Sequence, residues 1–189
     1  MLNESTSKSA RRTKHLFKDA LMRLLETESF ACISVKDIVD TADYNRTTFY
    51  NHYYDKFDLL DDITQELLDG FAESVKNSFK DCHLAQRKSM KDSDITVFDY
   101  IYQNRRAISL CFQNDVQKRL ILKSLDTIHQ SLIDSWTPFV NLTEKQISAD
   151  ARIFTYTLAG TIQGWMEEKF ATPPNEVRAA FVNYHSLKL

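Results

Sequence analysis

The clearest pattern in the chain is a pair of short amphipathic segments that begins at Ser34. In the first segment, apolar residues recur at i, i+3, i+4 and i+7, the spacing of a helix that buries one face, and they are Val35, Ile38, Val39 and Ala42. Ser34 precedes this helix as its expected N-cap. Asn45 is the expected N-cap of a second helix, in which the apolar Phe49 and Tyr53 are four residues apart. The pattern predicts two short helices joined by a tight turn.

The helical period continues through the rest of the chain and predicts an all-α fold. Further helices are expected over 11–28, 55–80, 95–104, 105–112, 115–136, 147–170 and from 172 onward. The polar segment 83–94 lacks periodicity and is predicted to be a loop. We divide the chain into a helical head with a basic N-terminal arm over 1–54 and a larger helical body over 55–189.

The helix over 55–80 is expected to be a continuous connector of about seven turns between head and body. Phe57 is predicted to pack in the head. At the other end of the connector, Phe71, Val75 and Phe79 are predicted to pack against helices that carry Tyr100, Phe112 and Trp136.

Composition supports the helical prediction and excludes several functions. The 189 residues include only three glycines and three prolines, too few for a fold rich in turns. No G-x-G-x-x-G or G-x-x-x-x-G-K loop can be assembled, so nucleotide use through such loops is not expected. The three cysteines and five histidines have no metal-ligand spacing, and no cofactor or metal is predicted. Without a signal peptide or an apolar run of about 20 residues, the protein is expected to be cytoplasmic, with no membrane partner.

The surface opposite Phe49 and Tyr53 carries hydrogen-bonding side chains and only one formal charge. These residues are Arg46, Thr47, Thr48, Tyr50, Asn51 and His52. A helix-turn-helix presents such a face to the DNA major groove. Six Lys and Arg residues between 8 and 23, against one acid, make a basic arm that suits a phosphate backbone.

The run A-D-Y-N-R-T-T-F-Y-N-H-Y-Y-D-K-F-D-L-L, over 42–60, resembles the DNA-binding region of TetR-family bacterial transcriptional regulators. Tyr50, His52 and Lys56 match the family motif. Asp43 stands where the turn usually has Gly, and Asp tolerates a left-handed backbone at modest cost. The resemblance covers roughly a quarter of the chain in detail.

The resemblance implies two kinds of DNA contact. Bases are expected to be read by Lys36, Arg46 and Thr47. Phosphates are expected to be held by Ser34, Thr48, Tyr50, His52 and Lys56. Lys36 is equally compatible with an ordinary exposed lysine.

The resemblance also implies an effector pocket and a dimer in the body. The aromatic and sulfur-rich faces between 95 and 136 suggest a pocket lined by Phe98, Tyr102, Cys111, Phe112, His129 and Trp136, although such a set can also be plain core. Residues on the last two helices suggest the dimer interface: Phe154, Leu158, Ile162, Trp165, Met166, Phe181 and Tyr184. Gly160 and Gly164, four residues apart, would let a partner helix approach closely. The alternative is that these helices only close the core of one chain.

These observations predict a dimeric, sequence-specific regulator of double-stranded DNA that binds an inverted-repeat operator, represses transcription and is switched by a small, mostly apolar effector. A second possibility keeps the DNA-binding head but has a body regulated by a protein partner. A helical enzyme ranks lowest, because no catalytic constellation stands out.

Overall fold

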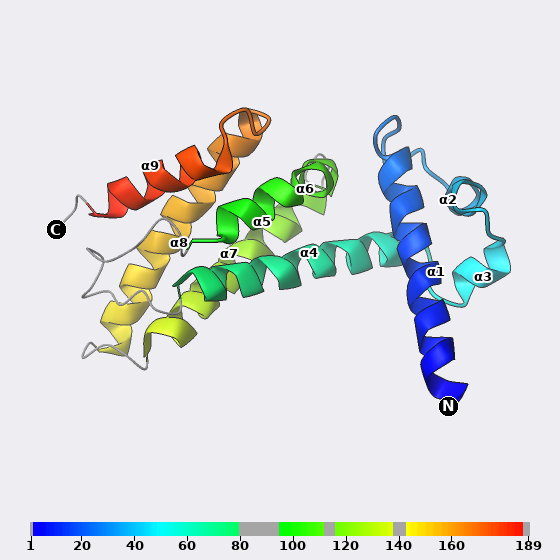
Figure 1. Ribbon diagram of the computed structural model, residues 1–189, viewed down its shortest axis with the longest axis horizontal. Coiled ribbons are helices and arrows are strands. Elements are labelled where there is room, and N and C mark those ends of the chain that lie inside the picture. The colour runs from blue at the N-terminus through cyan, green and yellow to red at the C-terminus, as the bar shows by residue number, and fades with distance from the viewer. Residues whose placement is uncertain (1, 80–94, 112–115, 138–142, 187–189) are drawn as a thin grey trace. The chain divides into compact units, whose positions relative to one another are not determined.

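The computed structural model describes residues 2–79, 95–111, 116–137 and 143–186, and these fold into helices without strands (Figure 1). The helices are α1 Leu2–Leu24, α2 Val35–Ala42, α3 Arg46–Tyr50, α4 Lys56–Phe79, α5 Val97–Gln103, α6 Arg105–Cys111, α7 Val116–Trp136, α8 Glu144–Glu167 and α9 Pro174–Ser186. The all-α prediction is confirmed. The predicted loop at 83–94 lies outside the described residues.

The chain forms two compact units, Met1–Glu66 and Leu67–Leu189. The boundary falls within α4, so the first turns of this helix belong to the first unit. The sequence division at residue 54 had given all of α4 to the body.

The first unit is built around Phe17 of α1. Its ring, fully buried, makes edge contacts with Tyr44, Phe49 and Tyr53 at centroid distances of 5.4, 5.2 and 6.5 Å. Leu21, one turn further along α1, is also fully buried. One face of α1 therefore packs against α2, α3 and the segment that follows α3.

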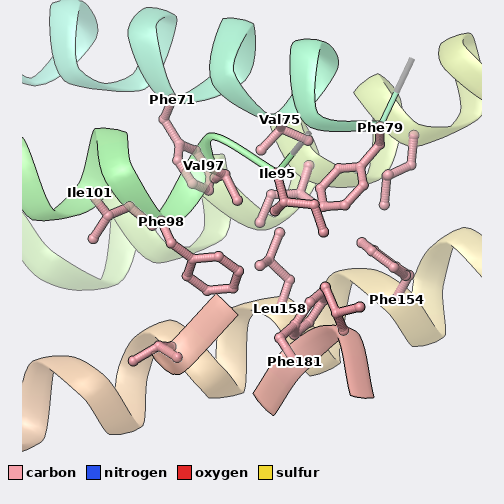
Figure 2. Close-up of a cluster of buried hydrophobic side chains, with 14 of the residues drawn as sticks. Phe71, Val75, Phe79, Ile95, Val97, Phe98, Ile101, Phe154, Leu158 and Phe181 are labelled. Carbon is pink, nitrogen blue, oxygen red and sulfur yellow. The ribbon is translucent and has the colours of Figure 1, made fainter. Parts of the chain in front are cut away.

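The second unit has one continuous apolar core. In Figure 2, Phe71, Val75 and Phe79 of α4 point toward Phe98 of α5 and Phe154 of α8. The remaining labelled side chains of this core are Ile95, Val97, Ile101, Leu158 and Phe181. Trp136 is part of the same core, and Tyr100 packs against this core, as predicted for the end of the connector. Phe112 lies outside the described residues.

Gly70 is a place of close approach between α4 and α5. The ring of Tyr100 lies over it, and a Cβ added to Gly70 would stand 2.7 Å from the Cε2 and Cζ atoms of that ring. The Tyr100 hydroxyl donates a hydrogen bond of 2.9 Å to the carbonyl oxygen of Leu67. Glycine is needed here for space, since its φ is not positive.

Candidate nucleic-acid interface

Local hydrogen bonds fix both ends of α2. The Ser34 hydroxyl oxygen accepts from the Asp37 amide at 3.3 Å, and the Asp37 carboxylate accepts from the Ser34 amide at 2.9 Å and from its hydroxyl at 2.6 Å. These hydrogen bonds from Ser34 lower the pKa of Asp37. Asp43 ends the helix in the left-handed region, with φ 56°. The predicted N-cap at Ser34 and the predicted turn at Asp43 are confirmed, while the phosphate contact of Ser34 stays a prediction.

The helix α3 is held at its start by its own cap. The Asn45 side-chain oxygen accepts from the Thr48 amide at 2.8 Å and from the Thr48 hydroxyl at 3.0 Å. Phe49 is fully buried, while Arg46 and Thr47 are exposed. A helix of five residues has few internal hydrogen bonds, so the cap and the buried ring position its polar face.

An ionic network joins α1 to the first turns of α4. Asp62 accepts a hydrogen bond from the Tyr53 hydroxyl at 2.8 Å and lies 3.1 Å from the Lys18 ammonium and 3.4 Å from that of Lys14. Lys18, only 10% exposed, also lies 2.5 Å from the Glu66 carboxylate. These contacts fix the start of α4 to the helix that supports α3.

The network shifts two pKa values. Burial opposes the charge on Asp62, but hydrogen bonds from Tyr53 and Lys18 and the charges of Lys18 and Lys14 outweigh it, so the pKa of Asp62 is lowered. Burial and the hydrogen bond to Asp62 raise the pKa of Tyr53. The Asp62 carboxylate is therefore stabilised as an anion, and the Tyr53 hydroxyl as a donor.

Lys56 makes contacts within the chain that the sequence did not predict. Its ammonium donates to the backbone carbonyls of Ile33, Phe30 and Ala31 at 2.6, 2.8 and 3.2 Å. It also lies 4.8 Å from the Phe30 ring centroid and 5.6 Å from that of Phe57. An ammonium has three N–H donors, and these carbonyls take all of them. In this structure Lys56 binds the segment before α2 to the start of α4.

The basic arm forms one side of an open hollow. Its lining residues are Lys8, Arg11, Arg12, His15, Lys18 and Glu66, and its volume is about 460 Å³. Positions 8, 11, 12 and 15 lie on one face of α1. The arm thus has a continuous cationic face in the first unit.

The structure brings the predicted DNA-contacting residues together in the first unit. Arg46, Thr47, Tyr50 and Lys36 are exposed, with Tyr50 at 56%, and His52 is half-buried. The hydroxyls of Ser34 and Thr48 cap α2 and α3, as described above. Phe57, predicted to pack in the head, contacts the Phe30 ring there at a centroid distance of 5.2 Å but leaves 57% of its surface exposed.

The residues of the predicted pocket are divided between core and partly exposed positions. Phe98, Cys111 and Trp136 are buried, and burial raises the pKa of the Cys111 thiol to about 11. Tyr102 and His129 are half-buried. The indole N–H of Trp136 is buried and has no hydrogen-bond partner within the described part of the chain.

Most of the predicted dimer interface lies inside a single chain. Phe154, Leu158, Trp165 and Phe181 are at most 3% exposed and belong to the core of the second unit; Ile162 and Met166 pack against it, and Tyr184 is 46% exposed. A buried side chain is not available to a second copy. On α8, the large exposed apolar residues are instead Ile153 and Tyr156, at 61% and 62%.

Three contacts were missed by sequence reasoning: the Asp62 network, the use of Lys56, and Tyr100 over Gly70. A signal existed for the first, since Lys14 and Lys18 are four residues apart, as are Asp62 and Glu66, so each pair shares a helix face. The other two involve backbone atoms, which leave no pattern in a sequence.

Together these features define a class: a helix-turn-helix transcriptional regulator with a separate helical body. Residues 88–184 match a TetR family model described as the C-terminal region of transcriptional regulators. The match covers more than half of the chain, and the protein belongs to the TetR family of transcriptional regulators. The matched region therefore belongs to a family of transcriptional regulators and not to a family of enzymes.

Relatives agree with this assignment. The chain is 24% identical over 169 residues to an uncharacterised HTH-type regulator, YxbF, of Bacillus subtilis (strain 168); the match covers 85% of this chain but 41% of that relative. The fold of this chain is similar to that of a TetR-family regulator from Syntrophomonas wolfei (TM-score 0.69, 14% identity, 93% of both chains). It is also similar to DhaS, a dihydroxyacetone kinase operon activator (TM-score 0.67, 18% identity, 92% of this chain and 93% of that one).

Among the described residues, no group of three or more His, Cys, Asp or Glu side chains is placed to hold a metal ion. None of the described helices has the length and apolar character needed to cross a bilayer.

Proposed function

We propose that the protein is a dimeric, sequence-specific DNA-binding regulator whose α3 enters the major groove. The observation that carries the proposal is the exposed polar face of α3, fixed from behind by Phe49 on Phe17 and at its start by Asn45. A side chain discriminates between bases only when its backbone is held in place, and this arrangement holds it. A chain that acts on genomic DNA would work in the cytoplasm.

Within this proposal, Lys36, Arg46 and Thr47 contact bases. Tyr50 and His52 hold phosphates through the hydroxyl and the imidazole. Ser34 and Thr48 add phosphate contacts by turning their hydroxyl hydrogens away from Asp37 and Asn45. For Lys56 we replace the phosphate contact by an indirect role, the placement of α2 relative to α4.

The dimer is proposed to form through the outer face of α8. Exposed residues recur there at alternating intervals of four and three, the period of a helix-packing seam: Ala149, Ile153, Tyr156, Gly160, Gln163 and Glu167. A Cβ added at Gly160 or Gly164 would meet no atom of the described residues within 4 Å, so both leave room for a partner. Tyr184 of α9 is retained from the predicted set. A two-fold dimer requires an inverted-repeat operator.

The switch is proposed to be a small, mostly apolar effector bound in the second unit. The indole N–H of Trp136, which packs beside Phe154 of α8 and has no partner among the described residues, supports it. Buried donors in proteins normally have a partner, so an acceptor on a ligand would satisfy this group. Tyr102 or His129 would supply a second polar contact. Binding would tilt α4 and change the separation of the two α3 helices; the alternative keeps this tilt but assigns it to a protein partner.

The sign of regulation is proposed to be repression. A fold neighbour is described as an operon activator, so activation is the competing outcome. A reporter fused to the bound promoter separates them: deletion of the gene raises expression in the first case and lowers it in the second.

The central test is recovery of DNA. The purified full chain is mixed with fragmented genomic DNA, and bound fragments are sequenced; enrichment of fragments that share an inverted repeat is expected. Arg46→Ala should then weaken binding by about 1 to 3 kcal/mol and relax preference at one base position. The matched control is Arg106→Ala, an exposed arginine of α6. Absence of any enriched fragment would refute the proposal.

A further inference from the structure

Exposed aromatic rings occur in the segment between α3 and α4 and in the first turn of α4. Tyr54 is 85% exposed and Phe57 is 57% exposed, and they follow Tyr50, at 56%, within seven residues. Solvent-exposed rings grouped in this way usually mark a contact surface, whereas scattered ones do not. We refer to Tyr54 and Phe57 as the aromatic edge.

Polar groups around the aromatic edge are already used within the chain. Lys56 donates to three carbonyls, as described above. The Asp55 carboxylate accepts from the amides of Phe57 and Asp58 at 2.8 and 2.9 Å, and the Asp58 carboxylate accepts from the Tyr54 amide at 2.9 Å. Apart from the Tyr54 hydroxyl, this surface therefore presents ring carbon instead of the donors that would bind a phosphate.

The aromatic edge is continuous with the elements proposed to contact DNA. The Lys56 ammonium lies 2.6 Å from the carbonyl of Ile33, the residue before Ser34, so the starts of α4 and α2 are adjacent. Phe57 meets Phe30 edge-on at 5.2 Å. Tyr54 comes four residues after the end of α3. A duplex that places bases against α3 would pass its sugar–phosphate strand close to these rings.

We infer that the aromatic edge packs against the deoxyribose faces of the DNA backbone next to the groove that α3 enters. This inference rests on the proposed function and adds two contact residues to it. Sugar carbons provide the apolar surface that exposed rings can bury, whereas phosphates need donors that are taken here. The contact positions the head without reading sequence and releases no counterions, so its contribution to affinity does not depend on salt.

The test uses the full chain and an operator duplex recovered as above, with binding titrated by fluorescence anisotropy at several salt concentrations. The double variant Tyr54→Ala/Phe57→Ala should bind about fivefold to tenfold more weakly, on operator and unrelated duplex alike. The slope of log K against log salt should stay unchanged, while loss of one phosphate contact would reduce it by about 0.9. Phe57→Leu, which keeps an apolar side chain, should recover part of the loss.

A proximity measurement complements the titration. A photoreactive benzoylphenylalanine at position 57 should crosslink to DNA, while the same group at Asp126, exposed on α7, should not. If the wild-type chain binds no DNA, the proposed function fails. Three results would refute only the inferred DNA contact of the aromatic edge, provided that the wild-type chain binds DNA. These are equal binding by the double variant, a smaller salt slope of the double variant, and crosslinking of position 57 to protein alone.

Discussion

The two units use exposed apolar side chains in different settings. In the first, Tyr54 and Phe57 lie next to a polar recognition face, and the nearest charged groups are bound to the backbone. In the second, Ile153 and Tyr156 lie on the exposed face of α8. The opposite, apolar face of that helix is buried in the core of the same chain. A polar helix face predicts exposure directly. An apolar stripe predicts that a helix face is buried, but it does not tell whether the same chain or a partner chain covers that face.

The strongest test of this comparison is to place a charge on each side of α8. Trp165 is 3% exposed, stacks on Tyr102 at 5.9 Å and donates its indole N–H to the Thr172 carbonyl at 2.8 Å. Trp165→Arg should destabilise the second unit by about 3 to 5 kcal/mol, because an unpaired charge would enter the core. Tyr156→Arg should instead yield a folded monomer.

Thermal unfolding by circular dichroism and sedimentation velocity distinguish the two variants. A folded, monomeric Trp165→Arg protein would support the dimer interface that was first predicted from the sequence, on the apolar face of α8. A dimeric Tyr156→Arg protein would remove α8's outer face from consideration.

The second test compares two glycines in helix interiors. Gly70→Ala should destabilise the protein by about 1 to 3 kcal/mol, since the new Cβ would overlap the Tyr100 ring. Gly160→Ala should stabilise an isolated chain by up to about 1 kcal/mol through helix propensity, yet weaken the dimer if a partner helix lies there. Chemical denaturation over a range of protein concentrations measures both effects.

Tyr100→Ala provides the control for this pair. In the Gly70→Ala background it should remove much of the penalty, because the overlapping ring is gone. Equal stability of Gly70→Ala and wild type would mean that the ring moves aside freely. A Gly160→Ala dimer as tight as wild type would place the seam elsewhere.

Features that depend on residues close together in the sequence were predicted, whereas features that depend on contacts between distant residues were not. Caps at Ser34 and Asn45 and the turn at Asp43 were predicted because they act over three or four residues. The all-α fold followed from scarce glycine and proline. The role of Lys56 and the dimer face required tertiary positions: the first involves carbonyls more than 20 residues away, and the second depends on which stripe the monomer buries.

The third test asks whether Lys56 acts through its charge or through placement. Lys56→Met keeps the side-chain stem but removes the donor from three carbonyls. The first unit should become less stable by about 1 to 2 kcal/mol, since solvent can replace only part of these hydrogen bonds. DNA affinity should fall with a salt slope within the error of the wild-type slope. A reduction of about 0.9 would instead assign the ammonium to a phosphate.

The smallest expected effect concerns acid and the Asp62 network. Because the pKa of Asp62 is lowered in the folded chain, the folded state binds fewer protons than the unfolded state in the range below about pH 4, where a free Asp titrates. The stabilisation is therefore fully present above that range and is lost as the pH falls through the lower folded value. Asp62→Asn should be less stable than wild type near neutral pH, and the difference should shrink on acidification. Hydrogen exchange of amides in α1 and α3, measured from pH 7 down to pH 3, reports on this unit separately from the second. A difference that is constant over this range would mean that ionisation of Asp62 does not contribute to the stability of this unit.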